Sequence, residues 1–284
     1  MPKKQRSVIH TVCGVHTTDG AGVRLVRVLD NTTTDAYDPI LLLDSFDSTD
    51  PADYTAGFPM HPHRGIETIS YVYKGAMRHK DSLGSADTVS DGGVQWMTAG
   101  SGILHEEQLP PTKRMLGVQL WLNLPQKDKM APPSYHAITA EKIEEIPFAG
   151  GFLRLLAGSY LQHQGFQGRY LPLDYYDIHI NGNAAFTVDT KTDASVMIFT
   201  LTGSITVGAE TLPEKTAAKL SPGDAVTLTA SHQGAQVLFM SSRRLDEAVA
   251  WGGSIVMNTP EELQECFREL RLGTFLKNTL SYEK

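Results

Sequence analysis

The sequence predicts an all-β protein built from two β-rich halves, each a sandwich or barrel of short strands. Two observations lead to this prediction. Short runs of alternating, β-branched or aromatic residues recur along the whole chain, and turns containing glycine, proline or asparagine separate them at modest intervals. With 284 residues and a hydrophobic fraction of 41%, the chain has the length of one large or two ordinary domains with packed cores.

Strand patterns fill the first half of the chain. Residues 22–29 alternate polar and apolar side chains, residues 40–46 form the short apolar run of a buried strand, and residues 67–73 are rich in β-branched and aromatic side chains. Residues 47–60 are rich in Asp, Pro, Ser and Thr, which predicts a loop. Further strands are expected at residues 77–81, 94–97, 103–108 and 115–124.

A domain boundary is expected where these strand patterns pause. Pro132, Pro133 and a polar stretch at residues 139–145 interrupt them. We therefore predict an N-terminal domain of residues 1–140 and a C-terminal domain of residues 141–284. In the second domain, strands are expected at residues 152–157, 174–180, 185–188, 196–202, 205–207, 225–228 and 237–240.

The best helix signal lies near the C-terminus, at residues 260–271. Thr259 is a natural N-cap, Pro260 occupies the first helical position, and acidic residues fill the first turn. Gly273 is a natural stop. The expected apolar stripe consists of Leu263, Cys266, Phe267 and Leu270.

Composition excludes several classes of protein. The net charge of -7 argues against a broad nucleic-acid-binding face, and no apolar run is long enough to span a membrane. The basic residues 2–6 are followed by no apolar stretch, so we interpret them as a solvated tail and not as a signal peptide. Cys13 and Cys266 lie far apart in the sequence, and no disulfide between them is expected. We predict a cytoplasmic monomer.

A His-x-His run is the strongest chemical signal. Because side chains alternate along a strand, His61, His63 and Glu67 would share one face of a sheet, and Pro62 places the run at a strand start or edge. Imidazole and carboxylate together suit iron, manganese, zinc or copper. A single histidine is more often a surface or core residue, so the pair carries the prediction.

A second cluster follows a glycine-bearing turn. His105 and Glu107 repeat the spacing of two residues, so they too would share a strand face. Three imidazoles and one carboxylate would leave coordination positions open for substrate or dioxygen, unlike a closed structural zinc site. Glu67 and Glu106 are further candidate ligands.

Two long stretches of the chain resemble the signature motifs of the pirin family, within the cupin superfamily. They are residues 57–68 and 95–107, and residues 119–125 and 251–259 are similar to further pirin segments. Met60 departs from the family pattern, which has an acidic residue there. The resemblance implies a bicupin, in which two double-stranded β-helix (jelly-roll) barrels face each other.

The resemblance also implies which side chains hold a metal. One mononuclear metal, iron(II) before manganese, nickel, copper or zinc, would lie in the N-terminal barrel, and the C-terminal barrel would have no ligands. The ligands implied by the resemblance are His61, His63, His105 and Glu107. Glu67 then becomes a residue behind the metal site or a proton handler.

The activity implied by the resemblance is cleavage of flavonols such as quercetin by O2, a quercetin 2,3-dioxygenase reaction. Glu107 or Glu67 would accept the flavonol proton, and Phe58, Met77 and Gln119 would line the substrate site. The alternative is a regulatory protein that senses redox state or metal through a protein partner, either a transcription factor or a metabolic enzyme. Both functions require the same four ligands, and neither involves direct contact with nucleic acid or membrane.

Overall fold

The structure, a computed structural model, describes residues 3–277 and confirms the all-β class and the short C-terminal helix. Its strands form sheets of nine, seven and four strands and two small two-stranded ribbons. The predicted helix corresponds to α2 (Pro260–Leu272), and α1 (Thr34–Tyr37) is a single turn. Among the described residues, no helix has the length and apolar character needed to cross a membrane.

The chain divides into two compact units that are assembled from separate segments. Unit 1 contains Met1–Val15, Val28–Pro39 and Glu141–Leu245. Unit 2 contains His16–Arg27, Ile40–Ala140 and Asp246–Lys284. Unit 1 therefore takes two N-terminal segments in addition to residues 141–245, and the C-terminal helix belongs to unit 2.

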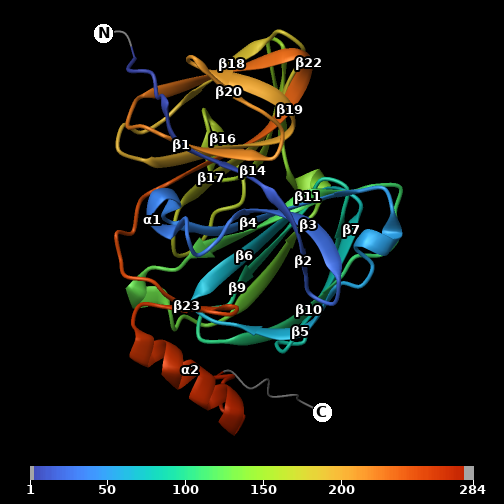
Figure 1. Cartoon of the computed structure of the whole chain (residues 1–284), viewed down its shortest axis with the longest axis vertical. Helices are drawn as coiled ribbons and strands as arrows, with labels where there is room; N and C mark the ends of the chain where they lie inside the picture. The colour runs from blue at the N-terminus through green and yellow to red at the C-terminus, as the bar shows by residue number, and fades with distance from the viewer. Residues whose placement is uncertain (1–2, 278–284) are drawn as a thin grey trace. The chain divides into compact units, whose positions relative to one another are not determined.

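Unit 1 is built on the nine-stranded sheet, coloured yellow-green to orange in Figure 1 apart from the blue β1. The strand order is β1-β21-β19-β22-β17-β14-β13, with β18 paired to β22 and β20 paired to β19. A two-stranded ribbon, β15–β16, adds to it. The bounds are β1 Val8–Cys13, β13 Glu145–Phe148, β14 Gly151–Ala157, β15 Ser159–Tyr160, β16 His163–Gln164, β17 Leu173–Ile180, β18 Ala185–Asp189, β19 Ser195–Val207, β20 Glu210–Leu212, β21 Thr216–Leu220 and β22 Ala225–Ser242.

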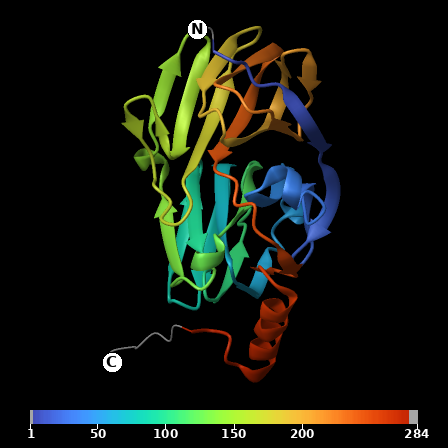
Figure 2. The ribbon, with the colours of Figure 1, turned by 90° about the vertical axis from the view of Figure 1, so that its left-hand side faces the viewer.

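Unit 2 contains the seven-stranded sheet, in the order β12-β9-β6-β11-β4-β3-β2, and the four-stranded sheet β5-β10-β7-β8. Figures 1 and 2 show these strands in blue to green. The bounds are β2 Val15–Asp19, β3 Val23–Leu29, β4 Ile40–Ser48, β5 Phe58–His63, β6 Ile66–Lys74, β7 Ala76–Asp81, β8 Ala86–Ser90, β9 Gly93–Thr98, β10 Ile103–Gln108, β11 Met115–Asn123, β12 Ser134–Ile138, β23 Ala250–Gly252 and β24 Ile255–Met257, with 3-10 turns η1 Pro51–Asp53, η2 Gln126–Asp128 and η3 Ala140–Lys142.

The strand carrying the His-x-His run lies where Pro62 requires it. β5 pairs with β10 on one side and is the last strand of the four-stranded sheet, so the missing N–H of the proline interrupts no second ladder. The predicted loop at residues 47–60 is shorter than expected, because β4 continues to Ser48 and β5 begins at Phe58.

The basic start of the chain is exposed at residues 3–5, as predicted, but not at Arg6. Arg6 is buried, and its guanidinium donates hydrogen bonds to Thr190 Oγ1 at 2.7 Å and to the carbonyl of Ser221 at 2.8 Å. The prediction failed because these acceptors come from turns almost two hundred residues away. Pro2 lies outside the described residues.

The caps of α2 are those the sequence predicted. Thr259 and Glu262 form a reciprocal capping box, and Gly273 ends the helix with a positive φ of 71°. Cys266 is buried beneath the helix in a small apolar cluster, whereas Phe267 stays at the margin of the predicted stripe with 36% of its surface exposed. The helix therefore packs through part of its apolar face.

Two buried cations fasten the turn after β5 to the C-terminal segment of unit 2. Arg64 donates to the carbonyls of Ser101 at 2.8 Å and Phe275 at 2.6 Å, and to Glu269 at 2.8 Å. Lys129 Nζ donates to the Gly65 carbonyl at 2.8 Å, to Asn123 Oδ1 at 2.5 Å and to the Val256 carbonyl at 2.9 Å.

The chain passes so close at this turn that only glycine fits at position 65. Its φ is +79°, and a Cβ there would lie 1.9 Å from the Val256 carbonyl oxygen. The end of β5, and with it His63, is therefore held from both sides.

Burial lowers the pKa of Lys129 to about 7, against weaker opposing effects of Glu247 and Glu262. An unfolded chain keeps this proton to about pH 10.4. Above pH 7 the unfolded state therefore binds more protons than the folded state, so the free energy of unfolding rises with pH, by about 1.4 kcal/mol per pH unit at most. We expect the free energy of unfolding of wild type, minus that of Lys129→Met, to increase from pH 7 to 9 in denaturant titrations.

Lys127→Met provides the control, because Lys127 is exposed on the same turn. Its stability difference from wild type should stay constant with pH. A constant difference for Lys129→Met as well would mean that Lys129 remains charged in the folded protein.

Candidate metal centre

The antiparallel pairing of β5 with β10 brings three histidines together. His105 lies opposite His61, and Ile103 lies opposite His63. One ring nitrogen from each of His61, His63 and His105 falls within 4.8 Å of the others. We call these three residues the histidine cluster. The two sequence motifs therefore meet in one place, in the interior of unit 2.

The hydrogen bonds of the cluster fix which nitrogen of each ring is free. His61 Nδ1 lies 2.9 Å from the Pro59 carbonyl, and His63 Nδ1 lies 3.0 Å from the Ser254 carbonyl. A carbonyl oxygen only accepts, so both Nδ1 atoms carry a proton, and in the neutral form of each ring Nε2 then presents a lone pair. These two Nε2 atoms are 3.0 Å apart, close enough to bind one shared cation.

The third nitrogen completes a site that fits a metal. His105 Nε2 is buried without a hydrogen-bond partner in the described structure, and an orphaned buried acceptor is costly unless something binds it. Burial, followed by the neighbouring histidines, holds the pKa of His63 and of His105 well below the usual range. Both rings are therefore neutral near pH 7, and the neutral imidazole is the form that binds metals.

Glu107 lies beside the cluster but its carboxylate is engaged elsewhere. It is buried on β10, and Gln119 Nε2 on β11 donates to Oε1 at 3.1 Å and to Oε2 at 2.8 Å. Ser70 Oγ adds a contact of 3.4 Å to Oε1. The structure thus brings three of the four predicted ligands together and holds the fourth against Gln119, across the interior between the two sheets of unit 2.

Glu67 is not part of this interior. The register pairs Glu67 with Thr98 and Ser70 with Gln95, so Glu67 and Ser70 lie on opposite faces of β6. Ser70 faces Glu107, whereas the Glu67 carboxylate accepts a hydrogen bond from Thr98 Oγ1 at 2.6 Å. Burial raises the pKa of Glu67 despite the Thr98 bond. We therefore assign Glu67 no role in binding metal or moving protons, unlike the sequence-based prediction.

The predicted apolar residues lie at one end of the same interior. A β-bulge in β5 places Phe58 opposite Glu107, with the exposed Pro59 and Met60 together opposing Glu106. Met77 is buried in a core cluster against which Phe58 packs. Both are thus part of this core cluster, and Phe58 also lies opposite Glu107. Glu106 points to the outer face, 4.0 Å from Lys80 Nζ.

Sequence reasoning missed several neighbours of the cluster. Trp121 meets the ring of His63 edge to face, with centroids 5.1 Å apart. His79 and Asp81 lie behind His105 and hydrogen-bond to each other at 2.8 Å. Their spacing of two residues in a predicted strand is the same signal as His-x-His, and it predicts a shared face. Nothing in the sequence points to the Ser254 carbonyl.

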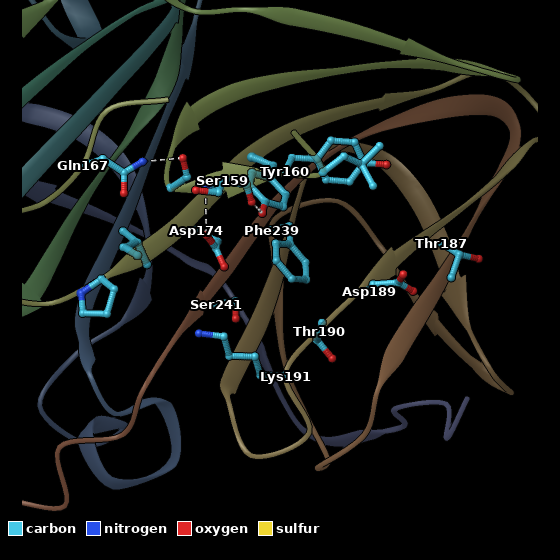
Figure 3. Close-up of a pocket in the computed structure, with 15 residues that line it drawn as sticks. Ser159, Tyr160, Gln167, Asp174, Thr187, Asp189, Thr190, Lys191, Phe239 and Ser241 are labelled. Carbon is cyan, nitrogen blue, oxygen red and sulfur yellow. Dashed lines mark hydrogen bonds between the residues drawn. The ribbon is translucent and has the colours of Figure 1, made fainter. Parts of the chain in front are cut away.

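Unit 1 contains a different kind of pocket, with a volume of about 500 Å³ (Figure 3). Its wall includes the stacked rings of Tyr176 and Phe239, with centroids 5.2 Å apart, and polar side chains of Asp174, Lys191 and Ser241. The lining residues that the structure describes include no histidine. This pocket therefore lacks the imidazole donors of the histidine cluster.

Comparisons with known proteins agree with this geometry. The family model for pirin matches residues 22–122, and the model for the pirin C-terminal cupin domain matches residues 175–276. A Pseudomonas aeruginosa protein named "Putative quercetin 2,3-dioxygenase" is 38% identical over 280 residues, covering 95% of this chain and 98% of the relative.

Two solved structures extend the comparison. A crystal structure of quercetin 2,3-dioxygenase from Acinetobacter baumannii has a TM-score of 0.88 and 31% identity, and the match covers 95% of this chain and 98% of that one. A bacterial pirin from Escherichia coli, in complex with nickel(II), has a TM-score of 0.61 and 19% identity, with 85% and 95% covered. The second likeness concerns the fold alone.

The separation of Glu67 from the cluster gives a direct test. We expect Glu67→Gln to bind cobalt(II) with the wild-type dissociation constant and the wild-type visible spectrum, because its carboxylate lies on the far face of β6. His105→Ala should lose saturable binding, because it removes one of three converging donors. A weakened or spectrally altered cobalt site in Glu67→Gln, in a variant with wild-type circular dichroism, would place Glu67 at the metal after all.

Proposed function

The chain belongs to the pirin family, and from that premise we propose that it is a metal-dependent dioxygenase that cleaves flavonols such as quercetin with O2. The observation that carries the proposal is the convergence of three histidine ring nitrogens, from the buried His63 and His105 and the half-buried His61, beside a buried carboxylate. The names of similar proteins support the same reaction class.

The proposed ligands are His61, His63, His105 and Glu107, holding one iron(II) ion. A divalent metal bound there supplies Lewis acidity and a template for both reactants. Manganese, nickel, copper and zinc suit the same donor set, since selectivity depends on geometry and supply as well as on ligand type. The nickel(II) in the Escherichia coli pirin is a property of that protein.

Glu107 is our candidate for the base that accepts the flavonol hydroxyl proton. It is buried, and both its oxygens are already oriented by Gln119. A hydrogen-bond donor on both oxygens fixes the carboxylate plane and leaves lone pairs for a proton from the substrate. Gln119 would therefore position the base in addition to lining the site.

A planar aromatic substrate requires apolar walls with few polar groups. Phe58 lies opposite Glu107 in the strand register, and Met77 belongs to the core cluster against which Phe58 packs. We propose that these two side chains border the flavonol rings. We also propose a reducing, cytoplasmic setting, which the two free cysteines support.

The activity test starts from protein purified without oxygen and loaded with iron(II). On mixing with quercetin and O2, we expect loss of flavonol absorbance together with carbon monoxide release. Both signals should disappear in His61→Ala, which lacks a ligand. They should persist in Glu67→Gln, which is altered on the other face of β6.

Two results would contradict the proposal. One is flavonol loss at the same rate in metal-free protein. The other is a stable iron-loaded protein that shows no turnover across a flavonol panel but binds a protein partner in only one oxidation state. The second result would favour the regulatory role that the resemblance also allows.

A further inference from the structure

His79 and Asp81 on β7 form a buried pair directly behind the histidine cluster. His79 Nε2 lies 2.8 Å from Asp81 Oδ2, and His79 Nδ1 lies 3.5 Å from His105 Nδ1. Both side chains are at most 1% exposed. The three residues form a chain of contacts that ends at the metal-facing ring of His105.

The carboxylate of Asp81 can only accept in this chain. Its Oδ1 accepts backbone N–H groups from Leu83 at 2.8 Å and Ser85 at 3.0 Å, which fixes the orientation of the group. Its Oδ2 therefore faces His79, and His79 Nε2 carries the proton that it donates to that oxygen.

The proton on His79 Nε2 decides the tautomer of His105. In the neutral form of His79 this is the only N–H of the ring, and Nδ1 is then an acceptor. It faces His105 Nδ1, which therefore carries a proton and leaves His105 Nε2 with a free lone pair. That is the nitrogen found buried without a hydrogen-bond partner in the described structure.

The Nδ1 atoms of the three cluster histidines have different kinds of partner. His61 and His63 each place Nδ1 against a backbone carbonyl, and a substitution does not remove a carbonyl. His105 places Nδ1 against a side chain, whose acceptor character depends on a second side chain. The tautomer of His105 is thus the one that a point substitution can reverse.

Stacking on Tyr135 also restrains the orientation of the His79 ring. Tyr135 stacks on it with centroids 3.9 Å apart and an angle of 7° between the planes. The stack restricts rotation of the imidazole, so its two nitrogens keep their separate partners. Histidine ligands in metalloproteins commonly depend on such outer partners for orientation and basicity.

We propose that Asp81 and His79 are positioning residues that hold His105 in its Nδ1–H tautomer and so make its Nε2 available to the metal. This rests on the metal site of the proposed function but not on the oxidation of a flavonol. A change in the pair should alter metal affinity even in a protein that never meets quercetin.

Asp81→Asn tests the proposal most sharply. The amides of Leu83 and Ser85 require an oxygen at the Oδ1 position, so the new NH2 group faces His79 and donates to its Nε2. His79 then carries its proton on Nδ1, and His105 must accept there and protonate its own Nε2. We expect zinc(II) affinity to fall about 10- to 100-fold, measured by competition with a chelator.

The second readout is the tautomer itself, which requires no metal and no turnover. Long-range ¹H–¹⁵N spectra of metal-free protein distinguish protonated from unprotonated ring nitrogens. Wild type should show His105 protonated at Nδ1, and Asp81→Asn should show it protonated at Nε2. Asp87→Asn is the matched control, because Asp87 is an exposed aspartate opposite His79 on β8, and it should match wild type in both measurements.

A pair of substitutions at His79 keeps the test decisive if Asp81→Asn does not fold. His79→Asn places an amide oxygen near the position of Nδ1 and should keep most of the zinc affinity. His79→Phe preserves the stack on Tyr135 but offers no acceptor, and should lose affinity to the same extent as Asp81→Asn.

Wild-type zinc affinity in Asp81→Asn with His105 still protonated at Nδ1, or equal affinities for the two His79 variants, would overturn the proposal. Failure of the proposed function gives a different pattern. In that case the variants would rank as expected for zinc, and no iron-loaded form would consume quercetin.

Discussion

The register between β5 and β10 is the constraint on which the rest of the site depends. It sets His61 opposite His105, and a slip of one residue would turn every side chain of β5 to the other face. The edge position of β5 makes this register vulnerable, because only one ladder holds it. The turn at Gly65, locked by Arg64 and Lys129, supplies the second restraint.

The same interior buries several polar side chains, and hydrogen bonds offset part of the cost of burying them. Three imidazoles and the Glu107 carboxylate lie within a β-barrel core, where an unpartnered polar group costs about 1–3 kcal/mol. Each Nδ1 has an acceptor, and Glu107 has Gln119. Of the ring nitrogens of the histidine cluster, His105 Nε2 is the one buried without a hydrogen-bond partner in the described structure, and a cation bound by the cluster would relieve that cost.

The sequence predicted the class, most strands, α2 with its caps, and the meeting of the three histidines, because these depend on local periodicity and on motifs. It misplaced Glu67 for a physical reason. Alternation was carried from His63 through the turn at Gly65, but β5 and β6 belong to different sheets, so the parity of one does not continue in the other. The burial of Arg6 was missed because its acceptors lie far along the chain.

The C-terminal segment shows why two motifs do not by themselves make the site. Ser254 lies about 190 residues beyond His63, yet its carbonyl is what assigns the proton of that ring to Nδ1. The Val256 amide donates to the Arg64 carbonyl at 3.1 Å, and Arg64 reaches on to Glu269 and Phe275. These contacts hold in place the segment that carries the Ser254 carbonyl. A chain ending near residue 140 would keep all three histidines but lose the acceptor of His63, so residues 254–275 support the candidate metal centre although none of them is a proposed ligand.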